Sequence, residues 1–392
     1  MQNWHLAQGY RYAGIVGGLR SEPGRRDLAV IVSDTPANAA GVFTQNRVCA
    51  APVRISRARL PRTDARAIVI CSGNANACTG EQGLRDAERM AELVANEIGC
   101  SPLQVLVAST GVIGRPLPMP ILEAGLPRAT KAVEAGAKAF SDAAHAILTT
   151  DSRIKVSTHA FGQYALTGFA KGAAMIGPNM ATMLGFALTD APIPSEFLHG
   201  ALKRAADKSF NCISVEGHTS TNDTVFALAN GTGPVLSGDE LREFESHLHA
   251  VCADLARQIA SDAEGANHLI TIDVEGTRTD ADARTIAKAI AESALVKTAV
   301  YGADPNWGRV VSAAGYCGVG FEEKDLSLWM GETLLYRDGA PIPFDAATAS
   351  AYLRNNREVE FRLVFKLGHG RCRFYTCDLT EEYVKLNADY TT

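Results

Sequence analysis

The chain has 392 residues, 46% of them hydrophobic, and its 38 lysines and arginines against 43 aspartates and glutamates leave a formal net charge of −5. The apolar content excludes a chain that is disordered throughout, and the lack of a basic excess argues against nucleic acid or an anionic membrane as a partner. At roughly 150 residues per domain, this length allows two or three lobes.

The first half of the chain is predicted to alternate strands with helices. Short apolar runs are typical of buried strands, and they occur at 28–32, 67–70 and 105–108. A helix is expected after the second run, opened by a capping box of Thr79 and Gln82. The alanine-rich stretch 129–148 predicts another helix, and weak alternation over 156–168 predicts a hairpin arm that runs into a loop.

The second half contains the clearest helix of the chain. It is opened by a capping box of Ser237 and Glu240, and apolar residues then recur every three or four positions. Beyond it we expect a helix over Asp280–Ala291, and the apolar runs that predict strands are 269–274, 359–365 and 373–377. No repeat, low-complexity tract or long linker marks a boundary. The elements together indicate a mixed α/β fold with substantial antiparallel sheet.

The cysteine pattern and the lengths of the apolar runs indicate where in the cell the protein is found. The nine cysteines are scattered and odd in number, and no two have the C-x-x-C spacing of a zinc site. Reduced thiols are therefore expected rather than a disulfide framework. The first dozen residues lack an apolar signal core, and no run reaches the roughly 18 apolar residues of a membrane span. We predict a cytoplasmic protein.

The common catalytic signatures are missing from the chain. There is no G-x-G-x-x-G after a strand, no phosphate-binding G-x-x-x-x-G-K-[ST], no G-x-S-x-G and no H-E-x-x-H. The nine histidines are dispersed, and His247 and His249 are two apart, so they point to different sides of a helix. This pattern argues against a histidine-based triad and against a zinc site.

The segment 171–184, KGAAMIGPNMATML, stands out because small residues, a proline and three methionines surround Thr182. From the residues alone, a buried methionine-rich connection is the simpler interpretation. The alternative is a threonine nucleophile, whose hydroxyl needs an adjacent base. Cleavage of the peptide bond before Thr182 would supply that base, since an α-amine titrates near ~7.7–8.0.

This segment resembles the self-cleavage motif of the ornithine acetyltransferases, also called glutamate N-acetyltransferases. Seven further segments match the family in order along essentially the whole chain, which makes the resemblance specific. They are GRRDLAVIVSDTPANAAGVFTQNRVCAAPV, CSGNANACTG at 71–80, ASTGVIG at 108–114, FNCISVEGHTSTNDTVFALANG at 210–231, DAEGA at 262–266, VKTAVYGADPNWGR at 296–309 and DLTEEYVKLNADYTT at the end.

The resemblance implies a division of the chain and a nucleophile. The scissile bond would be Ala181–Thr182, which gives an α fragment of residues 1–181 and a β fragment of residues 182–392, with Thr182 as the acyl acceptor. Thr110 and Gly111 match the pair that stabilises the oxyanion. Without the family, residues 109–111 would be interpreted as a plain turn after the strand at 105–108.

The resemblance also implies substrate-binding residues. Lys171 matches a substrate-site lysine, and Glu264 matches the glutamate that meets the ammonium group of the amino acid. Asn387 and Thr392 match contacts at the C-terminal end. For the threonine of the TTD motif we choose Thr150 over its neighbour Thr149.

Three departures from the family pattern bear on substrate identity. Ala173 and Ala174 stand where KGSGM or KGxGM is usual, and Ala174 excludes a backbone with φ > 0 if one is required there. The usual TTDTxPK reads TTDSRIK, and His218 stands where an aspartate is common. None of these changes touches Thr182, Thr110 or Gly111.

The implied reaction is ping-pong transfer of an acetyl group from N2-acetylornithine to glutamate in arginine biosynthesis, with no metal and no redox cofactor. The resemblance leaves acetyl-CoA open as a second donor. The implied fold is a layered α/β/β/α architecture of intertwined fragments, assembled as a heterotetramer or larger. Alternatives are a paralogue with a different N-acyl donor, a hydrolase using the same acyl-enzyme, and a non-catalytic binder of amino acids.

Overall fold

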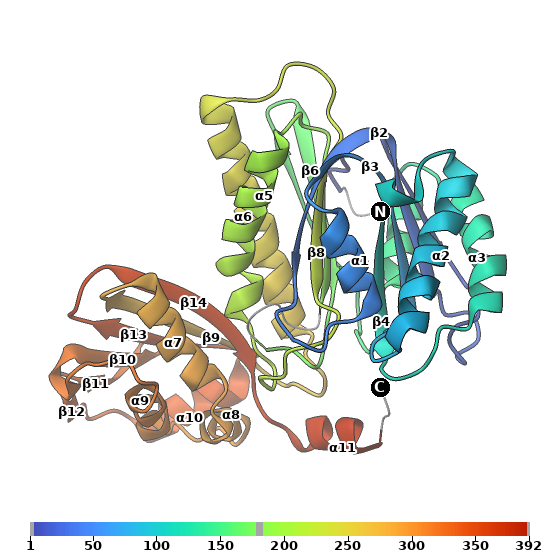
Figure 1. Ribbon diagram of the computed structural model, residues 1–392. Helices are drawn as coiled ribbons and strands as arrows, with labels where there is room; N and C mark the ends of the chain where they lie inside the picture. Colours follow the sequence, from blue (N-terminus) through green and yellow to red (C-terminus); the bar gives the residue numbers. More distant parts are fainter. Residues whose placement is uncertain (1–3, 178–182, 390–392) are drawn as a thin grey trace.

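The computed structural model describes residues 4–177 and 183–389. In this part of the chain two sheets form two lobes, shown in Figure 1. The larger sheet has eight strands in the order β4-β3-β2-β8-β7-β6-β5, with β1 paired to β2, and the smaller has six in the order β12-β11-β10-β13-β9-β14. The length allowed two or three lobes, but the absence of a linker signal in the sequence left the boundary between them unpredicted.

The first half of the larger sheet confirms the three strands predicted at 28–32, 67–70 and 105–108. Its strands are β1 (Tyr10–Ile15), β2 (Leu28–Phe43), β3 (Arg62–Asn74) and β4 (Val105–Val112). The strand at 105–108 runs further than its apolar residues because Thr110 still pairs with Ser72 of β3. The plain turn over 109–111 is therefore wrong, since these residues belong to β4.

The second half of the larger sheet interleaves segments from either side of the predicted cleavage point. Its strands are β5 (Lys155–Phe161), β6 (Tyr164–Lys171), β7 (Leu184–Thr189) and β8 (Thr224–Ala229). The antiparallel β5–β6 pair confirms the hairpin predicted around 156–168. Strands β7 and β8 lie between β2 and β6, hydrogen-bonded on both sides.

Strand β2 bends the larger sheet back on itself. Its first residues pair with β3 and its last residues, Asn38–Phe43, pair with β8, with register irregularities between Val32 and Ala39. Such irregularities bend a strand and increase its twist. The halves β2–β4 and β5–β8 therefore face each other.

Alternating side chains of these strands form three buried layers. Val30 and Val69 pack outward against helices, whereas Ile31 and Ile68 pack inward against aromatic residues of β6–β8 such as Phe186. The outer helices on the first half are α1 (Ala51–Arg59), α2 (Gly80–Ile98) and α3 (Met119–Lys131), and those on the second are α5 (Ser195–Asp207) and α6 (Gly238–Ser261). The α/β/β/α expectation is confirmed.

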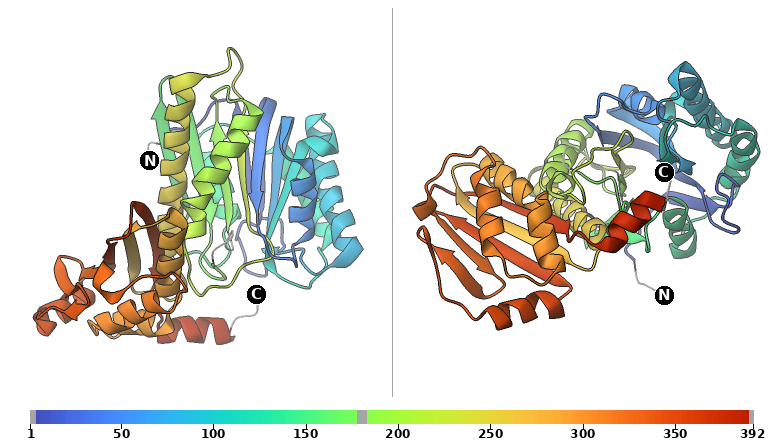
Figure 2. Two further views of the ribbon diagram at one scale, coloured as in Figure 1. Left: turned by 60° about the vertical axis from the view of Figure 1, so that its left-hand side comes forward. Right: turned by 90° about the horizontal axis from the view of Figure 1, so that it is seen from below.

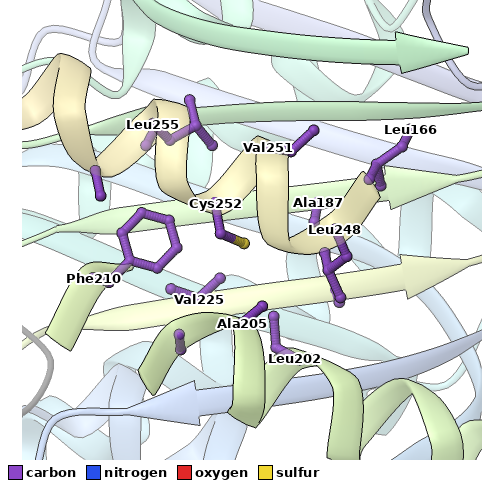
Figure 3. Packing of buried hydrophobic residues seen from close by; sticks show 14 of the residues in the cluster. Leu166, Ala187, Leu202, Ala205, Phe210, Val225, Leu248, Val251, Cys252 and Leu255 are labelled. Atoms are coloured by element: carbon purple, nitrogen blue, oxygen red, sulfur yellow. The ribbon is translucent and has the colours of Figure 1, made fainter. Parts of the chain in front are cut away.

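Helix α6 confirms the clearest helix prediction. Glu240 accepts a hydrogen bond from the backbone N–H of Ser237 at 3.3 Å, which is one half of the predicted capping box. Its apolar stripe is buried against α5 and the sheet (Figure 3), through residues that include Leu248, Val251 and Leu255. The 3.6-residue period of the sequence thus correctly identified the face that packs.

Two helix predictions need correction. A helix over 129–148 is wrong: α3 ends at Lys131 and α4 covers Ala137–Ala146, because Glu134 forms a bridge with Tyr12 and Gly136 has a φ of 100°. Helix α2 begins where predicted, but Thr79 donates its hydroxyl to Asn76 at 2.7 Å rather than closing a capping box.

The smaller lobe confirms the predicted elements 269–274, Asp280–Ala291, 359–365 and 373–377. Its strands are β9 (Leu269–Thr277), β10 (Leu326–Met330), β11 (Thr333–Arg337), β12 (Ala340–Pro341), β13 (Glu358–Phe365) and β14 (Gly370–Cys377). Its helices are α7 (Asp280–Ala291), α8 (Ala294–Tyr301), α9 (Trp307–Gly315) and α10 (Ala346–Asn355). Across both lobes, the short 3₁₀ turns of the described residues are η1 (Pro102–Gln104), η2 (Phe210–Cys212) and η3 (Glu323–Asp325).

Helix α11 (Glu381–Asp389) returns from the smaller lobe to the larger one, as Figure 2 shows from two sides. Gly265 fixes where it docks, because a Cβ there would lie 2.5 Å from the backbone nitrogen of Tyr383. The last described residues are thereby brought toward the larger lobe. Among the described helices, none combines the length and the apolar character needed to span a membrane.

Candidate active site

One pocket of about 330 Å³ gathers residues that the family resemblance singled out. They come from β4, the loop before β5, the end of β6, the loop after α6, and α11, and they are Thr110, Gly111, Thr150, Lys171, Glu264 and Asn387. The remaining predicted residues, Ala181, Thr182 and Thr392, lie outside the described residues. Their roles stay predictions.

Gly111 is at a point where only glycine fits. Its φ is +133°, and a Cβ on it would lie 2.3 Å from the carbonyl carbon of Gly73 in the adjacent strand β3. The end of β4 is also held by Asn222, whose amide donates to the carbonyls of Ala75 at 2.7 Å and Ser109 at 2.8 Å. The backbone around Thr110 and Gly111 is therefore fixed from both sides.

Lys171 lies at the centre of the pocket's charged groups. Its side chain is 2% exposed, and its ammonium donates to the hydroxyl of Thr110 at 3.2 Å. Burial lowers the pKa of Lys171, and the neighbouring carboxylate of Asp151 opposes that shift. A buried cation beside the pocket wall is suited to bind a substrate carboxylate.

Asp151 and Lys155, which the sequence analysis missed, form the buried ionic support of Lys171. The carboxylate of Asp151 accepts hydrogen bonds from the Lys155 ammonium and from the backbone N–H of Gly172, each at 2.6 Å. Burial alone would raise the pKa of Asp151, but the ammonium groups of Lys155 and Lys171 hold it well below its usual range. Lys155 also pairs with Asp262 at 2.6 Å.

Both threonines of the TTD motif contribute to the site around Asp151. The backbone N–H of Thr149 donates to Asp151 at 3.0 Å, while Thr149 and Thr150 both line the pocket. The departure Ser152 keeps a hydroxyl, which donates to Asp262. This departure therefore preserves the link between the loop before β5 and the end of α6.

The structure also shows how the chain accommodates the residues at 173, 174 and 218 that depart from the family pattern. Positive φ values in this segment occur at Gly172 and at Met175, with φ 57°, and not at Ala174, so a methyl group at 174 is tolerated. Ala173 is buried, and its carbonyl accepts a hydrogen bond from the backbone N–H of Glu264 at 3.0 Å. His218 is exposed and does not line the pocket.

Glu264 and Asn387 meet at the mouth of the pocket. The amide of Asn387 donates to the Glu264 carboxylate at 3.3 Å and to the carbonyl of Tyr383 at 3.0 Å. The docking of α11 on Gly265 sets this contact. The Glu264 carboxylate and the Lys171 ammonium are thus among the charged groups of both signs that line the pocket.

Asp223, also missed by the sequence analysis, contacts the residue after Thr182. Its carboxylate accepts a hydrogen bond from the backbone N–H of Met183 at 3.2 Å, and its side chain is fully buried. Burial raises the pKa of Asp223 well above its usual range, against the opposing charge of Lys171. A lone acid at the start of the apolar stretch TVFALA was the signal in the sequence.

Glu216 fixes the chain before the undescribed segment 178–182. Its carboxylate accepts a hydrogen bond from the backbone N–H of Ile176, and burial raises the pKa of Glu216 to about 7. Gly177 packs closely here, since a Cβ on it would lie 2.5 Å from the carbonyl carbon of Gly217. The contact of Glu216 with Ile176 and the contact of Asp223 with Met183 thus hold the residues on either side of segment 178–182.

The described residues contain no group of three or more histidine, cysteine or acidic side chains arranged to hold a metal ion. The arrangement provides a small pocket, a rigid β4 end with a glycine at positive φ, a buried lysine and the Glu264 carboxylate. These groups can bind an amino-acid-sized molecule and orient it toward the end of β4.

Comparison with known proteins identifies relatives along the whole chain. The sequence profile of the ArgJ family matches residues 11–392. The chain is 46% identical to the arginine biosynthesis bifunctional protein ArgJ of Thermosynechococcus vestitus, covering 98% of this chain and 97% of that protein. The ArgJ protein of Dehalococcoides mccartyi is also 46% identical, with 98% and 96% covered.

A solved structure is similar over part of the chain. The crystal structure of the arginine biosynthesis bifunctional protein ArgJ from Bacillus halodurans superposes with a TM-score of 0.52 at 40% sequence identity. The match covers 53% of this chain and 100% of that chain.

Proposed function

The chain belongs to the ArgJ family, and from this membership and the pocket we propose that it transfers an acetyl group from N2-acetylornithine to glutamate in arginine biosynthesis, through an acetyl-enzyme on Thr182. The observation that carries the proposal is the convergence of Thr110, Gly111, Lys171 and Glu264 on one small pocket. This pocket lies beside Asn222, whose neighbour Asp223 holds the residue after Thr182.

The proposal begins with self-cleavage. The Thr182 hydroxyl attacks the carbonyl of Ala181, and the peptide C–N bond breaks, which leaves an ester and frees the α-amine of Thr182. Water then hydrolyses the ester to the carboxylate of Ala181 and restores the Thr182 hydroxyl. The anchors at Glu216 and Asp223 support this step because they restrain the chain before and after the bond. The fragments would stay together, since β7 and β8 are inserted between β2 and β6.

The size of a relative's chain also supports cleavage. The Bacillus halodurans chain is matched over its full length by 53% of this chain, which is close to the share that residues 182–392 make up. We therefore propose residues 1–181 as the α fragment and 182–392 as the β fragment. The family resemblance further supports a heterotetramer or larger assembly in the cytoplasm.

In the proposed reaction, the α-amine of Thr182 takes the hydroxyl proton while the oxygen attacks the acetyl carbonyl. Thr110 and Gly111 stabilise the oxyanion, and a single donor of this kind is typically worth ~10²–10³ in rate. The amide bond then breaks, and ornithine leaves with the proton from the amine. The amine of glutamate attacks the acetyl ester, which forms N-acetylglutamate and restores Thr182.

Charged residues of the pocket set the substrate's orientation in this proposal. Lys171 binds the substrate carboxylate, because it is the buried cation next to Thr110, and Glu264 with Asn387 binds the ammonium end. Thr150 and Thr392 complete the substrate contacts. The word bifunctional in the names of the relatives supports acetyl-CoA as a second donor, whose thioester would form the same acetyl-enzyme.

The first test is the intact mass of the purified protein beside two variants. Wild type and Thr182→Ser should yield two fragments, because both keep a hydroxyl, while Thr182→Ala should remain one chain. If the wild-type protein stays uncleaved, Thr182 has no free α-amine to act as the base, and the proposed mechanism is refuted. Acetylornithine consumption then separates transferase from hydrolase: a rate that is the same with and without glutamate would favour hydrolysis.

A further inference from the structure

A second pocket, of about 400 Å³, brings two thiols together between η2 and β14. The sulfur atoms of Cys212 and Cys372 lie 3.8 Å apart, although the residues are 160 positions apart in sequence. Cys212 is buried and Cys372 is half-buried, and both line the pocket. None of the described residues that line this pocket also lines the candidate active site.

The two thiols differ in acidity because of their contact. The S–H of Cys372 donates to the sulfur of Cys212 and lowers the pKa of Cys212, while burial opposes this effect and the guanidinium of Arg284 adds to it. The same hydrogen bond, together with burial, raises the pKa of Cys372. Cys212 is thus the more acidic of the two thiols, which suits it to attack first while Cys372 resolves.

Other buried cysteines of the chain do not have this arrangement. The thiol of Cys71 donates to the hydroxyl of Ser109 at 3.2 Å, and Cys377 lies 3.5 Å from the ammonium of Lys297. Burial raises the pKa of Cys252 to about 12. The contact between two sulfur atoms therefore sets the Cys212–Cys372 pair apart from these three thiols.

The backbone around the pair is already fixed across the two lobes. Ile213 forms a parallel bridge with Tyr375, and the backbone N–H of Ser214 donates to the carbonyl of Tyr375 at 3.0 Å. Side-chain rotation is therefore the movement required to shorten the sulfur–sulfur distance to the roughly 2.05 Å of a disulfide.

The charges around the thiols favour a small neutral reagent. Four cationic and four acidic residues line the pocket, namely Lys208, Arg284, Arg371 and Arg373, and Asp207, Asp273, Glu275 and Asp280. Because the two signs balance, the pocket has no net attraction for an anion or a cation.

We propose that Cys212 and Cys372 form a reversible dithiol–disulfide site that is oxidised by low-molecular-weight disulfides. The thiolate of Cys212 attacks one sulfur of the reagent, whose S–S bond breaks to release one thiolate. The sulfur of Cys372 then loses its proton to that thiolate and attacks the sulfur of Cys212, expelling the second half of the reagent. The protein is oxidised by two electrons, and the reagent is reduced to two thiols.

The test uses the full-length wild-type protein and bis(2-hydroxyethyl) disulfide as the probe. After incubation, free thiols are alkylated and the digest is analysed by mass spectrometry without reduction. We expect a peptide pair joined through Cys212 and Cys372, which disappears on treatment with a dithiol. The exposed thiol of Cys78 is the internal control for the reagent, because an accessible free thiol shows whether the probe reacts at all.

The variant Cys372→Ser provides a second readout, since its hydroxyl can still donate to Cys212 but cannot resolve the adduct. A mixed disulfide on Cys212 should accumulate in this variant. The proposal would be overturned if Cys78 reacts while Cys212 and Cys372 of the wild type are both alkylated, or if they carry separate mixed disulfides. Both results are independent of self-cleavage and of acetyl transfer.

Discussion

The substitution Gly111→Ala isolates the close approach of β4 to β3. The new Cβ would lie 2.3 Å from the carbonyl carbon of Gly73 and 2.5 Å from the nitrogen of Asn74, both backbone atoms that cannot rotate away. A φ of +133° adds conformational strain of ~1–2 kcal/mol, and overpacking costs ~1–3 kcal/mol. The free energy of unfolding should therefore fall by about 2–5 kcal/mol.

Gly114→Ala is the matched control for this prediction. Gly114 also has a positive φ, of +80°, but a Cβ there meets nothing within 4 Å, so only the strain of ~1–2 kcal/mol applies. The difference between the two variants measures the clash together with the larger backbone strain at a φ of +133°. Urea titration of both, in the uncleaved Thr182→Ala background, gives the two free energies for a single chain.

Activity provides an independent measure in the cleavable background. Displacement of the β4 end should slow acetyl transfer by ~10²–10³ in Gly111→Ala, the effect expected from a lost oxyanion donor, while Gly114→Ala should transfer at nearly the wild-type rate. Equal stability losses in the two variants would refute the clash. A fully active Gly111→Ala would refute the oxyanion role.

Three further predictions concern charge and substrate contact. Asp151→Asn should cost ~3–5 kcal/mol of stability at neutral pH, because Lys155 loses one of its two counter-ions, both at 2.6 Å, and Lys171 loses its neighbouring carboxylate. The stability that Asp151 gives the wild type should be lost progressively as pH falls from its unfolded pKa of ~3.9 toward its lower folded pKa; a pH-independent difference in urea titrations would contradict this. Because the pKa of Glu216 is raised to about 7, the free energy of unfolding of the wild type should fall as pH rises from ~4.3 to 7, and that of Glu216→Gln should not. If the melting temperatures of the two proteins change with pH in parallel, the raised pKa is excluded. Asn387→Ala should raise KM for the amino acid and leave kcat nearly unchanged, since the amide orients Glu264, and an unchanged KM in initial-rate assays would remove it from the site.

Local sequence patterns predicted the strands and helices that have the clearest apolar spacing. The apolar runs at 28–32 and 105–108 and the periodic stripe of α6 identify strands and a helix because burial of one face depends on spacing within a few residues. The failure at 129–148 has the opposite cause. A contact of Glu134 with Tyr12, more than a hundred residues away, ends the helix that alanine content alone would continue.

Through its resemblance to a family, the sequence by itself determined which residues are candidates for catalysis and substrate binding. Its motifs singled out Thr110, Gly111, Lys171 and Glu264. The tertiary structure decided that they share one pocket, and it revealed the buried carboxylates that support them, such as Asp223. The acidity of a carboxylate depends on burial and on charges brought near by folding, which no local pattern records. The bend of β2 and the meeting of Cys212 with Cys372 are decided in the same way, by contacts between distant segments.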